Sequence, residues 1–220
     1  MESMMANMDA PAGFDTFENI RTDGYVLLAS LLKQPPSEEL RNILQNLQWE
    51  EAIPGKLNEA LTALRQAGHD YPLATIKDEF NRLFVGLGCG EMIPYASWYR
   101  EKMIQSLPLV PLRSDLIRLG IVRRSDSHEP EDHAAALCEV MAIISRKTNG
   151  WNYMTQAGFF EQHIASWMGS FFKDLQSAKS AGFYRTVGLF GLYFLESEGR
   201  YLKCHLNMIP DNKKRRRKAR

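Results

Sequence analysis

Apolar residues recur along the chain at the spacing of amphipathic helices, and no stretch alternates with period two for long enough to predict a sheet. The clearest example is a helix predicted to start near Pro72. Its apolar residues are spaced by 4, 3, 1 and 3 positions: Ile76, Phe80, Leu83, Phe84 and Leu87. This pattern predicts an all-α protein, folded as a compact single-domain bundle of roughly ten helices with flexible termini.

Caps and breaks divide this pattern into separate helices. Ser37 is a predicted N-cap, Gly68 is predicted to follow a helix C-terminus, and Pro130 suits a first helical turn. Residues 183–195 are apolar almost all round, which predicts a central buried helix. The predicted helices cover about 18–33, a segment after Ser37, 54–68, 72–87, 97–106, 112–119, 130–144, 159–175 and 183–195.

We expect one helical domain over residues 17–209, a flexible N-terminus over 1–16 and a basic disordered tail over 210–220. Gly86, Gly88 and Gly90 stand at every second position before Pro94, so this segment cannot continue a helix. We therefore predict a hinge near residues 86–97.

Composition points to a soluble protein, with 45% hydrophobic and 24% charged residues. The longest apolar run, Val187 to Leu195, covers nine residues, about half a membrane span, so no stable membrane insertion is expected. The first residues carry acids but no Lys or Arg, unlike a secretory signal. Cys89, Cys138 and Cys204 are too far apart for a disulfide framework. We expect a cytoplasmic location.

Charge is distributed unevenly along the chain. The last ten residues hold seven of the 27 bases and one of the 26 acids, which leaves the preceding 210 residues with a net charge of −5. A body of that sign is a poor host for nucleic acid and a fair host for a cationic ligand. No nucleic-acid partner is expected.

Several chemical motifs fail on spacing. His128 and His133 are five residues apart, whereas a zinc helix needs two histidines four apart, so no metal site is predicted. The loop from Gly86 to Gly90 lacks the Lys-Ser/Thr pair of a phosphate loop. No GxSxG motif occurs, and His163, within an apolar stripe, is interpreted as a core histidine. We predict no cofactor and no enzymatic activity.

One alternative stays open at this point. General acid–base chemistry by Glu129, Asp132 and His133 is compatible with the residue types present. Together with the loop from Gly86 to Gly90, Glu129 and His133 would then serve a nucleotide-binding or hydrolytic enzyme.

Four ordered segments resemble one family, the TorD/DmsD chaperones of molybdenum-containing redox enzymes, over about residues 20 to 200. They are Phe80-Asn-Arg-Leu-Phe-Val-Gly86, Pro94-Tyr95-Ala-Ser97, Glu129-Pro-Glu-Asp-His133 and Phe159-Phe-Glu-Gln-His163-Ile-Ala-Ser-Trp167. The acidic segment is the most specific of these. Two positions depart from the family pattern, because Phe80 stands where Trp or Tyr is common and Gly88 where some relatives have Trp.

The resemblance implies an all-helical protein that binds the twin-arginine signal peptide and the body of a molybdopterin-dependent oxidoreductase. Such a protein holds its client until the cofactor is inserted and then releases it for export. The sequence does not identify the client, and it does not distinguish a monomer from a homodimer. Carried over residue by residue, the peptide-binding positions implied are Phe80, Leu83, Phe84, Pro94, Tyr95, Asp132 and His133.

The residues themselves agree with a peptide host. Glu129, Glu131 and Asp132 supply three carboxylates within four positions, and carboxylates bind guanidinium groups through charge-assisted hydrogen bonds. Glu129 is therefore added to the predicted site. For the apolar part of the peptide, we expect the glycine hinge to let the helix around Phe80 and the loop at Pro94 separate into a groove.

Overall fold

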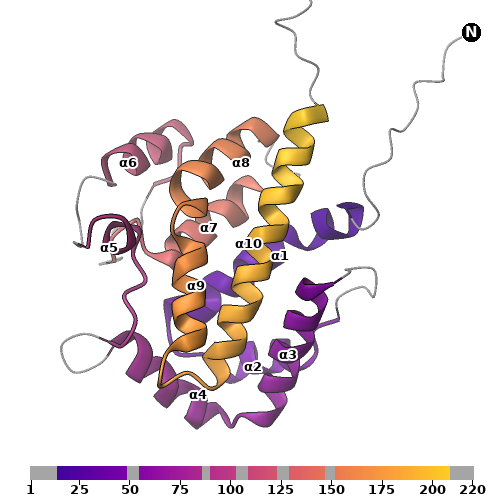
Figure 1. Cartoon of the computed structure of the whole chain (residues 1–220), viewed down its shortest axis with the longest axis vertical. Coiled ribbons are helices and arrows are strands. Elements are labelled where there is room, and N and C mark those ends of the chain that lie inside the picture. Colours follow the sequence, from indigo (N-terminus) through magenta and orange to yellow (C-terminus); the bar gives the residue numbers. More distant parts are fainter. Residues whose placement is uncertain are drawn as a thin grey trace, which may run out of the picture.

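The computed structural model describes residues 14–48, 55–85, 90–102, 109–122, 129–146 and 152–208. These residues form ten α-helices, two π-helical turns and no β-strand, so the predicted all-α fold is confirmed for the described part of the chain (Figure 1). The helices are α1 (Phe14–Lys33), α2 (Glu38–Gln45), α3 (Lys56–Asp70), α4 (Leu73–Phe80), α5 (Ala96–Glu101), α6 (Leu109–Arg118), α7 (Ala134–Ile144), α8 (Tyr153–Phe160), α9 (Met168–Ser177) and α10 (Phe183–Met208). The π-helical turns are η1 (Asn81–Val85) and η3 (Glu161–Ala165).

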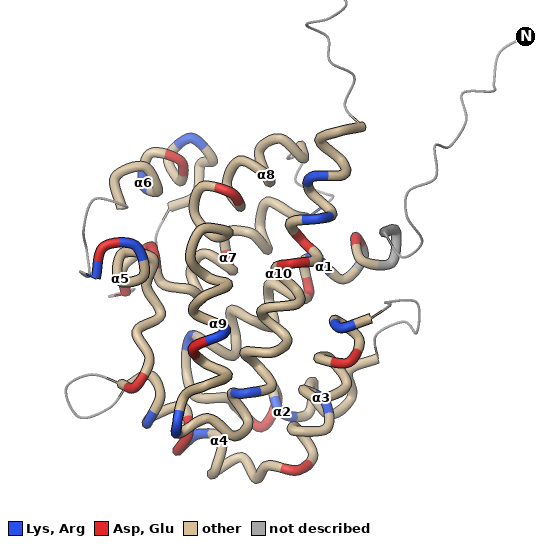
Figure 2. Tube along the Cα trace, viewed as in Figure 1, with Lys and Arg blue, Asp and Glu red and all other residues tan. Residues whose placement is uncertain are grey.

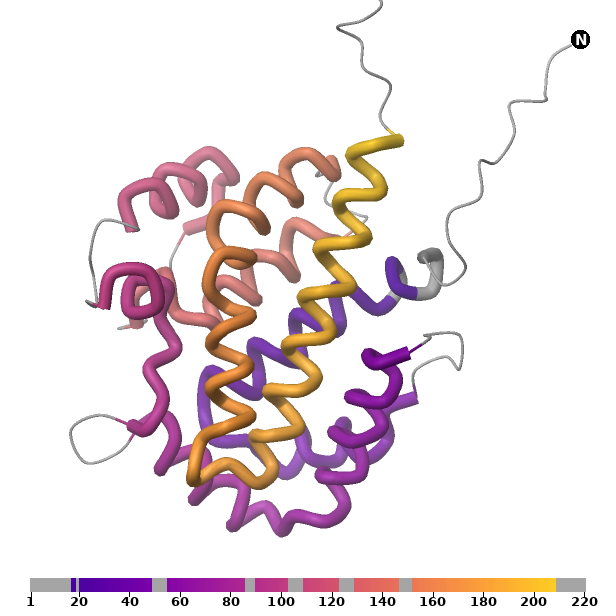
Figure 3. The backbone as a smooth tube through the Cα atoms, viewed as in Figure 1, coloured from indigo at the N-terminus to yellow at the C-terminus, as the bar shows by residue number. Residues whose placement is uncertain are grey.

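The long helix α10 lies at the centre of the packing. It contacts α1, α3, α4, α8 and α9, and Figure 3 shows α9 and α10 running side by side with α1 crossing behind them. Its segment from 186 to 195 carries no charge and is tan throughout in Figure 2. The side chains of Phe190 and Phe194 are fully buried. The predicted central helix is thus confirmed, and it extends past residue 195 to Met208.

Helix α1 is held in place by polar contacts as well as by its apolar face. The guanidinium of Arg21 donates to Glu198 of α10 at 2.6 and 2.7 Å and to Gln156 of α8 at 2.7 Å. Arg21 and Glu198 are buried, so each charge depends on the other for its solvation. Along its other side α1 packs against α7.

Of two predicted helix-end signals near α2 and α3, the one at Ser37 is confirmed and the one at Gly68 is wrong. Ser37 is the N-cap of α2, and its hydroxyl accepts from the Leu40 nitrogen at 3.1 Å, as predicted. Gly68, in contrast, lies inside α3, so its predicted place after the helix is wrong. A Cβ on Gly68 would lie 3.2 Å from that of Leu44, so the glycine serves the close approach of α2 rather than a turn.

Two other predicted helices differ from the observed ones. Pro130 lies before α7 rather than in its first turn, because His133 takes the N-cap position. The predicted helix over 159–175 is interrupted after η3 at Trp167, where φ is −144°. The Trp167 indole donates to the His163 carbonyl at 2.7 Å, and Arg100 donates to the Gln162 carbonyl, so side chains stabilise the break.

The predicted tails fall largely outside the described residues. Helix α1 begins at Phe14, three positions before the predicted domain boundary, while 1–13 and 209–220 are not described. The same holds for 86–89 of the predicted hinge. Among the described residues, no helix is long and apolar enough to cross a membrane.

Candidate functional site

Two predicted motifs meet as paired loops. The Ala96 nitrogen donates to the Asp132 carbonyl at 3.1 Å, and the Ala134 nitrogen donates to the Pro94 carbonyl at 2.8 Å. These bonds form an antiparallel bridge between Tyr95 and His133. Backbone pairing therefore holds residues 94–97 against 130–134, although more than thirty positions separate them in the sequence.

Asp132 joins the two loops a second time, through its side chain. Its Oδ2 accepts from the Ser97 nitrogen at 2.8 Å, at the N-terminus of α5, where a carboxylate is favoured. The residue is 1% exposed, so it lies beneath the surface rather than on it. Pro94 is buried as well. Both residues position the paired loops.

Tyr95, Glu129 and His133 form the rest of the site, with Tyr95 half-buried and His133 buried. The Tyr95 hydroxyl donates to Glu129 Oε2, and the Tyr95 ring meets the His133 ring edge-on, with centroids 5.0 Å apart. Burial, together with the Glu129 carboxylate, raises the pKa of Tyr95. Glu129 itself is exposed. A negative group is thus held at the surface by a tyrosine.

His133 caps α7 as a neutral imidazole. Its Nδ1 accepts from the Ala135 nitrogen at 3.1 Å, which requires an unprotonated Nδ1. Burial lowers the pKa of His133, and this effect outweighs the opposing carboxylates of Glu129 and Asp132. The lone pair of Nδ1 is therefore engaged in the cap, which leaves only Nε2 for any other contact.

Glu131 already holds an arginine. Its two carboxylate oxygens accept from Nε and Nη2 of Arg113, on α6, at 3.1 and 3.0 Å. Arg113 is about half exposed, whereas the Glu131 side chain is 14% exposed. The loop therefore presents one carboxylate in the two-pronged geometry that a guanidinium prefers.

An apolar pocket of about 290 Å³ opens beside the paired loops, between α6 and α7. Three carboxylates, Glu129, Glu131 and Glu139, belong to its lining together with Lys33 and His133. We call this cavity the acid-rimmed pocket. Its apolar lining consists of Leu116, Ile121, Val122, Ala135, Ala136, Val140 and Ile143.

Sequence reasoning missed this lining. The available signal was helix α7 itself, whose eleven residues include a single charged one, Glu139. One face of such a helix packs into the core, and the opposite face is left apolar at the surface, where Ile143 is 39% exposed. An excess of apolar residues over the needs of the core would have indicated a binding face.

The predicted residues on η1 and α4 lie elsewhere. Phe80 is 4% exposed and Leu83 is fully buried, while the half-buried Phe84 packs with Phe80 and with Tyr184 of α10. The structure therefore brings together Pro94, Tyr95, Glu129, Asp132 and His133. It does not join the three η1 and α4 residues to them at a common surface. Their predicted contact with a ligand stays a prediction.

Residues 90–92, within the predicted hinge, are tied to this segment. The Glu91 nitrogen donates to the Arg82 carbonyl at 3.2 Å, and the Met92 nitrogen donates to the Leu83 carbonyl at 2.7 Å. A Cβ on Gly90 would lie 2.4 Å from the Leu83 carbonyl oxygen, so this position requires glycine. Movement of the helix around Phe80 away from residues 90–92 would have to break these two bonds.

His163 is 3% exposed and donates from Nε2 to Asp115 Oδ2 at 2.6 Å, so its interpretation as a core histidine is confirmed. Burial and the guanidinium groups of Arg100 and Arg118 lower its pKa to about 4, which keeps the imidazole neutral. Among the described residues, no three His, Cys, Asp or Glu side chains are grouped closely enough to hold a metal ion; His128 lies outside them.

Comparison with known proteins now gives this geometry a context. The family model described as nitrate reductase delta subunit matches residues 50–173, more than half of the chain. The chaperone protein TorD of Aliivibrio salmonicida is 26% identical over 209 residues, covering 86% of this chain and 97% of the relative. TorD of Vibrio cholerae is 25% identical over 173 residues, covering 74% and 78%.

A solved structure shows the same fold. It is a putative redox enzyme maturation protein from Archaeoglobus fulgidus, with a TM-score of 0.53 and 15% identity over 89% of this chain and 99% of that one. Fold and relatives together define an all-helical protein similar to TorD chaperones. The chain belongs to the nitrate reductase delta subunit family, within which its relatives are TorD chaperones. The resemblance seen in the sequence motifs is thereby confirmed.

Proposed function

We propose that this chaperone binds the twin-arginine signal peptide and the apo form of an exported molybdopterin enzyme in the cytoplasm. It would assist insertion of the cofactor and prevent premature export. The observation that carries the proposal is the acid-rimmed pocket, in which carboxylates border an apolar cavity beside the two paired family motifs. A twin-arginine leader combines the same two chemistries, a pair of guanidinium groups and a run of apolar side chains.

The rim can receive the two arginines. Glu129 is exposed and held by Tyr95, so its free oxygen is directed without the cost of ordering a mobile side chain. Glu131 binds Arg113 through both oxygens, which is the contact that a client guanidinium would make in its place. Lysine offers one point charge rather than a planar fork, so an arginine pair is preferred.

The apolar lining can receive the apolar residues that follow the two arginines in the leader. Three apolar anchors buried in such a cavity would contribute roughly 5–8 kcal/mol before costs. Immobilising the peptide costs at least about 4 kcal/mol. Binding of the leader alone is therefore modest and reversible, as release of a mature client requires.

The predicted residues take different roles in this proposal. Tyr95, Glu129 and His133 contact the leader, while Pro94 and Asp132 position the paired loops. Phe80, Leu83 and Phe84 stabilise the packing of η1 and α4 against α10 and reach a client only if that segment opens. This last set is the part of the site that an open conformation would have to expose.

The test is a calorimetric titration of the full chain with two leader peptides that differ only in an Arg-Arg or a Lys-Lys pair. We expect the arginine peptide to bind about tenfold more tightly. Glu129→Gln should weaken that binding several-fold at an unchanged unfolding midpoint, and Glu196→Gln, at an exposed position on α10, should not. Equal binding of the two peptides would contradict carboxylate–guanidinium recognition.

A further inference from the structure

The acid-rimmed pocket is the first of three cavities that share lining residues in series. A second cavity, of about 660 Å³, shares Lys33, Glu139 and Ile143 with it. A third, of about 310 Å³, shares residues of α1 and α2 with the second: Val26, Ser30, Leu40 and Ile43. We call these three adjoining cavities the trough.

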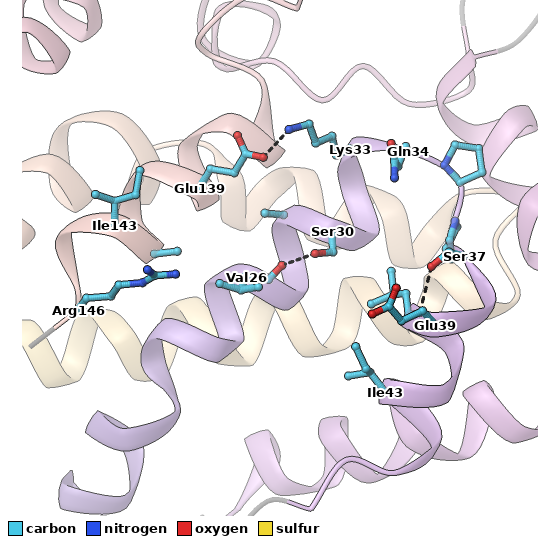
Figure 4. A pocket seen from close by; sticks show the side chains of 15 residues that line it. Val26, Ser30, Lys33, Gln34, Ser37, Glu39, Ile43, Glu139, Ile143 and Arg146 are labelled. Atoms are coloured by element: carbon cyan, nitrogen blue, oxygen red, sulfur yellow. Dashed lines mark hydrogen bonds and ion pairs between the residues drawn. The ribbon is translucent and has the colours of Figure 1, made fainter. Parts of the chain in front are cut away.

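Three helices build the middle of the trough. Helix α1 forms its floor, and α7 and α2 form its two walls, as Figure 4 shows for the middle cavity. Helices α1 and α7 run antiparallel, because Lys33 pairs with Glu139 at 2.7 Å while Thr22 bonds to Ser145 at 3.0 Å. From Lys33 back to Ile20 the trough follows α1 for thirteen positions, which corresponds to a length of about 20 Å.

Several apolar side chains in the trough remain partly exposed to solvent in the folded chain. Val26 is 42% exposed, Ile43 is 50% exposed and Ile143 is 39% exposed. They come from three different helices and line one depression, with Ile20, Leu40 and Leu47 half-buried beside them. Contiguous apolar surface of this kind marks an interaction site.

Charge distinguishes the two ends. At the acid-rimmed pocket Glu129, Glu131 and Glu139 face two cations, Lys33 in the lining and Arg113 paired with Glu131, so one negative charge remains in excess. In the middle cavity Lys33 and Arg146 balance Glu39 and Glu139, and the far cavity has Asp23 as its one charged lining residue. A segment with a positive end would therefore place that end at Glu129 and Glu131.

We propose that the apolar segment of the client's leader lies in the trough as a helix, running from the acid-rimmed pocket toward Ile20 and Leu47. This inference rests on the proposed function, since it assumes that the two arginines bind at Glu129 and Glu131. The apolar region of an export signal has about 7–15 residues, and a helix of about thirteen residues spans the roughly 20 Å of the trough. No core residue has to move, in contrast to a groove opened at Phe80.

The probes are synthetic peptides, titrated by fluorescence against the full chain. The long probe has two arginines followed by about thirteen Leu and Ala residues, and a photoreactive group marks the end of this apolar segment. The polar probe replaces that segment with Ser and Gly. A Lys-Lys version of the long probe tests the proposed function. The variant is Val26→Asp with Ile43→Asp. Its control is Val110→Asp, at a 67% exposed position outside the trough.

We expect the double variant to bind the long probe at least about tenfold more weakly, while the polar probe binds as it does to the unaltered chain. On the unaltered chain, the photoreactive group should attach to α2 near Ile43 and Leu47. Equal affinity of variant and unaltered chain for the long probe, or attachment to residues 80–95, would overturn the trough assignment alone.

Failure of the proposed function has a different signature. The unaltered chain would then bind the Arg-Arg and Lys-Lys long probes equally, or would bind neither, and the trough assignment would fall with it. Should the double variant unfold, the attachment site on the unaltered chain still decides the question.

Discussion

The buried carboxylate of Asp132 lies 2.8 Å from the backbone nitrogen of Ser97 and caps the start of α5 from the opposite loop. A cap normally comes from the residue just before its own helix. Here it comes from 35 positions further along the chain. The same contact therefore holds the N-terminus of α5 and fixes the loop that carries Glu129 and Glu131 beside the acid-rimmed pocket.

Asp132→Ala is expected to reduce the free energy of unfolding by about 1–3 kcal/mol, because the buried Ser97 nitrogen loses its acceptor. Asp132→Asn keeps an oxygen at this position and should cost less. Urea unfolding measures both changes. If the alanine variant were as stable as the unaltered chain, Asp132 would have no role in joining the loops.

Glu79 is a second carboxylate that caps a helix from a distance. It is 2% exposed and accepts from the nitrogens of Gly182, Phe183 and Tyr184 at 2.6 to 3.0 Å, at the start of α10. Glu79→Ala leaves three donors unsatisfied and should lower the free energy of unfolding by about 3 kcal/mol or more. Thermal or urea denaturation would show this loss.

Glu91 offers the matched control. It accepts from the nitrogens of Lys179 and Ser180, and these bonds lower its pKa, yet the residue is exposed. Glu91→Ala should therefore cost less than about 1 kcal/mol. A Glu79 variant no less stable than the Glu91 variant would show that burial does not set the strength of these caps.

The neutral cap formed by His133 makes stability depend on pH. Because burial lowers its pKa in the folded state, the unfolded chain binds more protons below about pH 6.5. Stability supplied by the neutral histidine is therefore present above that pH and is lost as the pH falls. His133→Asn keeps an N-cap that does not titrate.

We expect the drop in urea midpoint between about pH 7.5 and pH 5.5 to be smaller for His133→Asn than for the unaltered chain. His163, whose pKa is lowered to about 4, contributes the same slope to both proteins and cancels in the comparison. Parallel curves for the two proteins would show that His133 does not resist protonation.

Much of the fold follows from local signals in the sequence. Helix α2 begins after Ser37 because a hydroxyl there satisfies the Leu40 nitrogen, and α10 is buried because residues 186–195 offer no polar face. Both effects involve neighbours in the chain. The order of the motifs is also a property of the sequence alone, and it is sufficient to indicate the family.

Features that depend on distant residues could not be predicted. Gly68 resembles a helix terminator in the sequence, and only the approach of Leu44 explains why α3 continues through it. Phe80 and Leu83 were predicted to bind a peptide, and the sequence did not show that both side chains are buried, Phe80 beside Tyr184 of α10. The trough was not predicted because the apolar residues of its middle cavity come from α1, α2 and α7. Each of these helices leaves only a few apolar side chains outside the core.

Arg113 should compete with the client for Glu131. It occupies both oxygens of that carboxylate from an exposed position on α6, so an incoming guanidinium must displace it. Arg113→Ala removes this competitor at little cost, because an ion pair with one exposed partner contributes about 1 kcal/mol or less. We expect the Arg-Arg leader peptide to bind several-fold more tightly to this variant, and the Lys-Lys peptide to gain less, since lysine cannot form the two-pronged contact. Lys77→Ala, on α4 and outside the trough, is the control for the loss of one positive charge. If both variants gained equally, the effect would be one of net charge, and Glu131 would not be a contact for the leader.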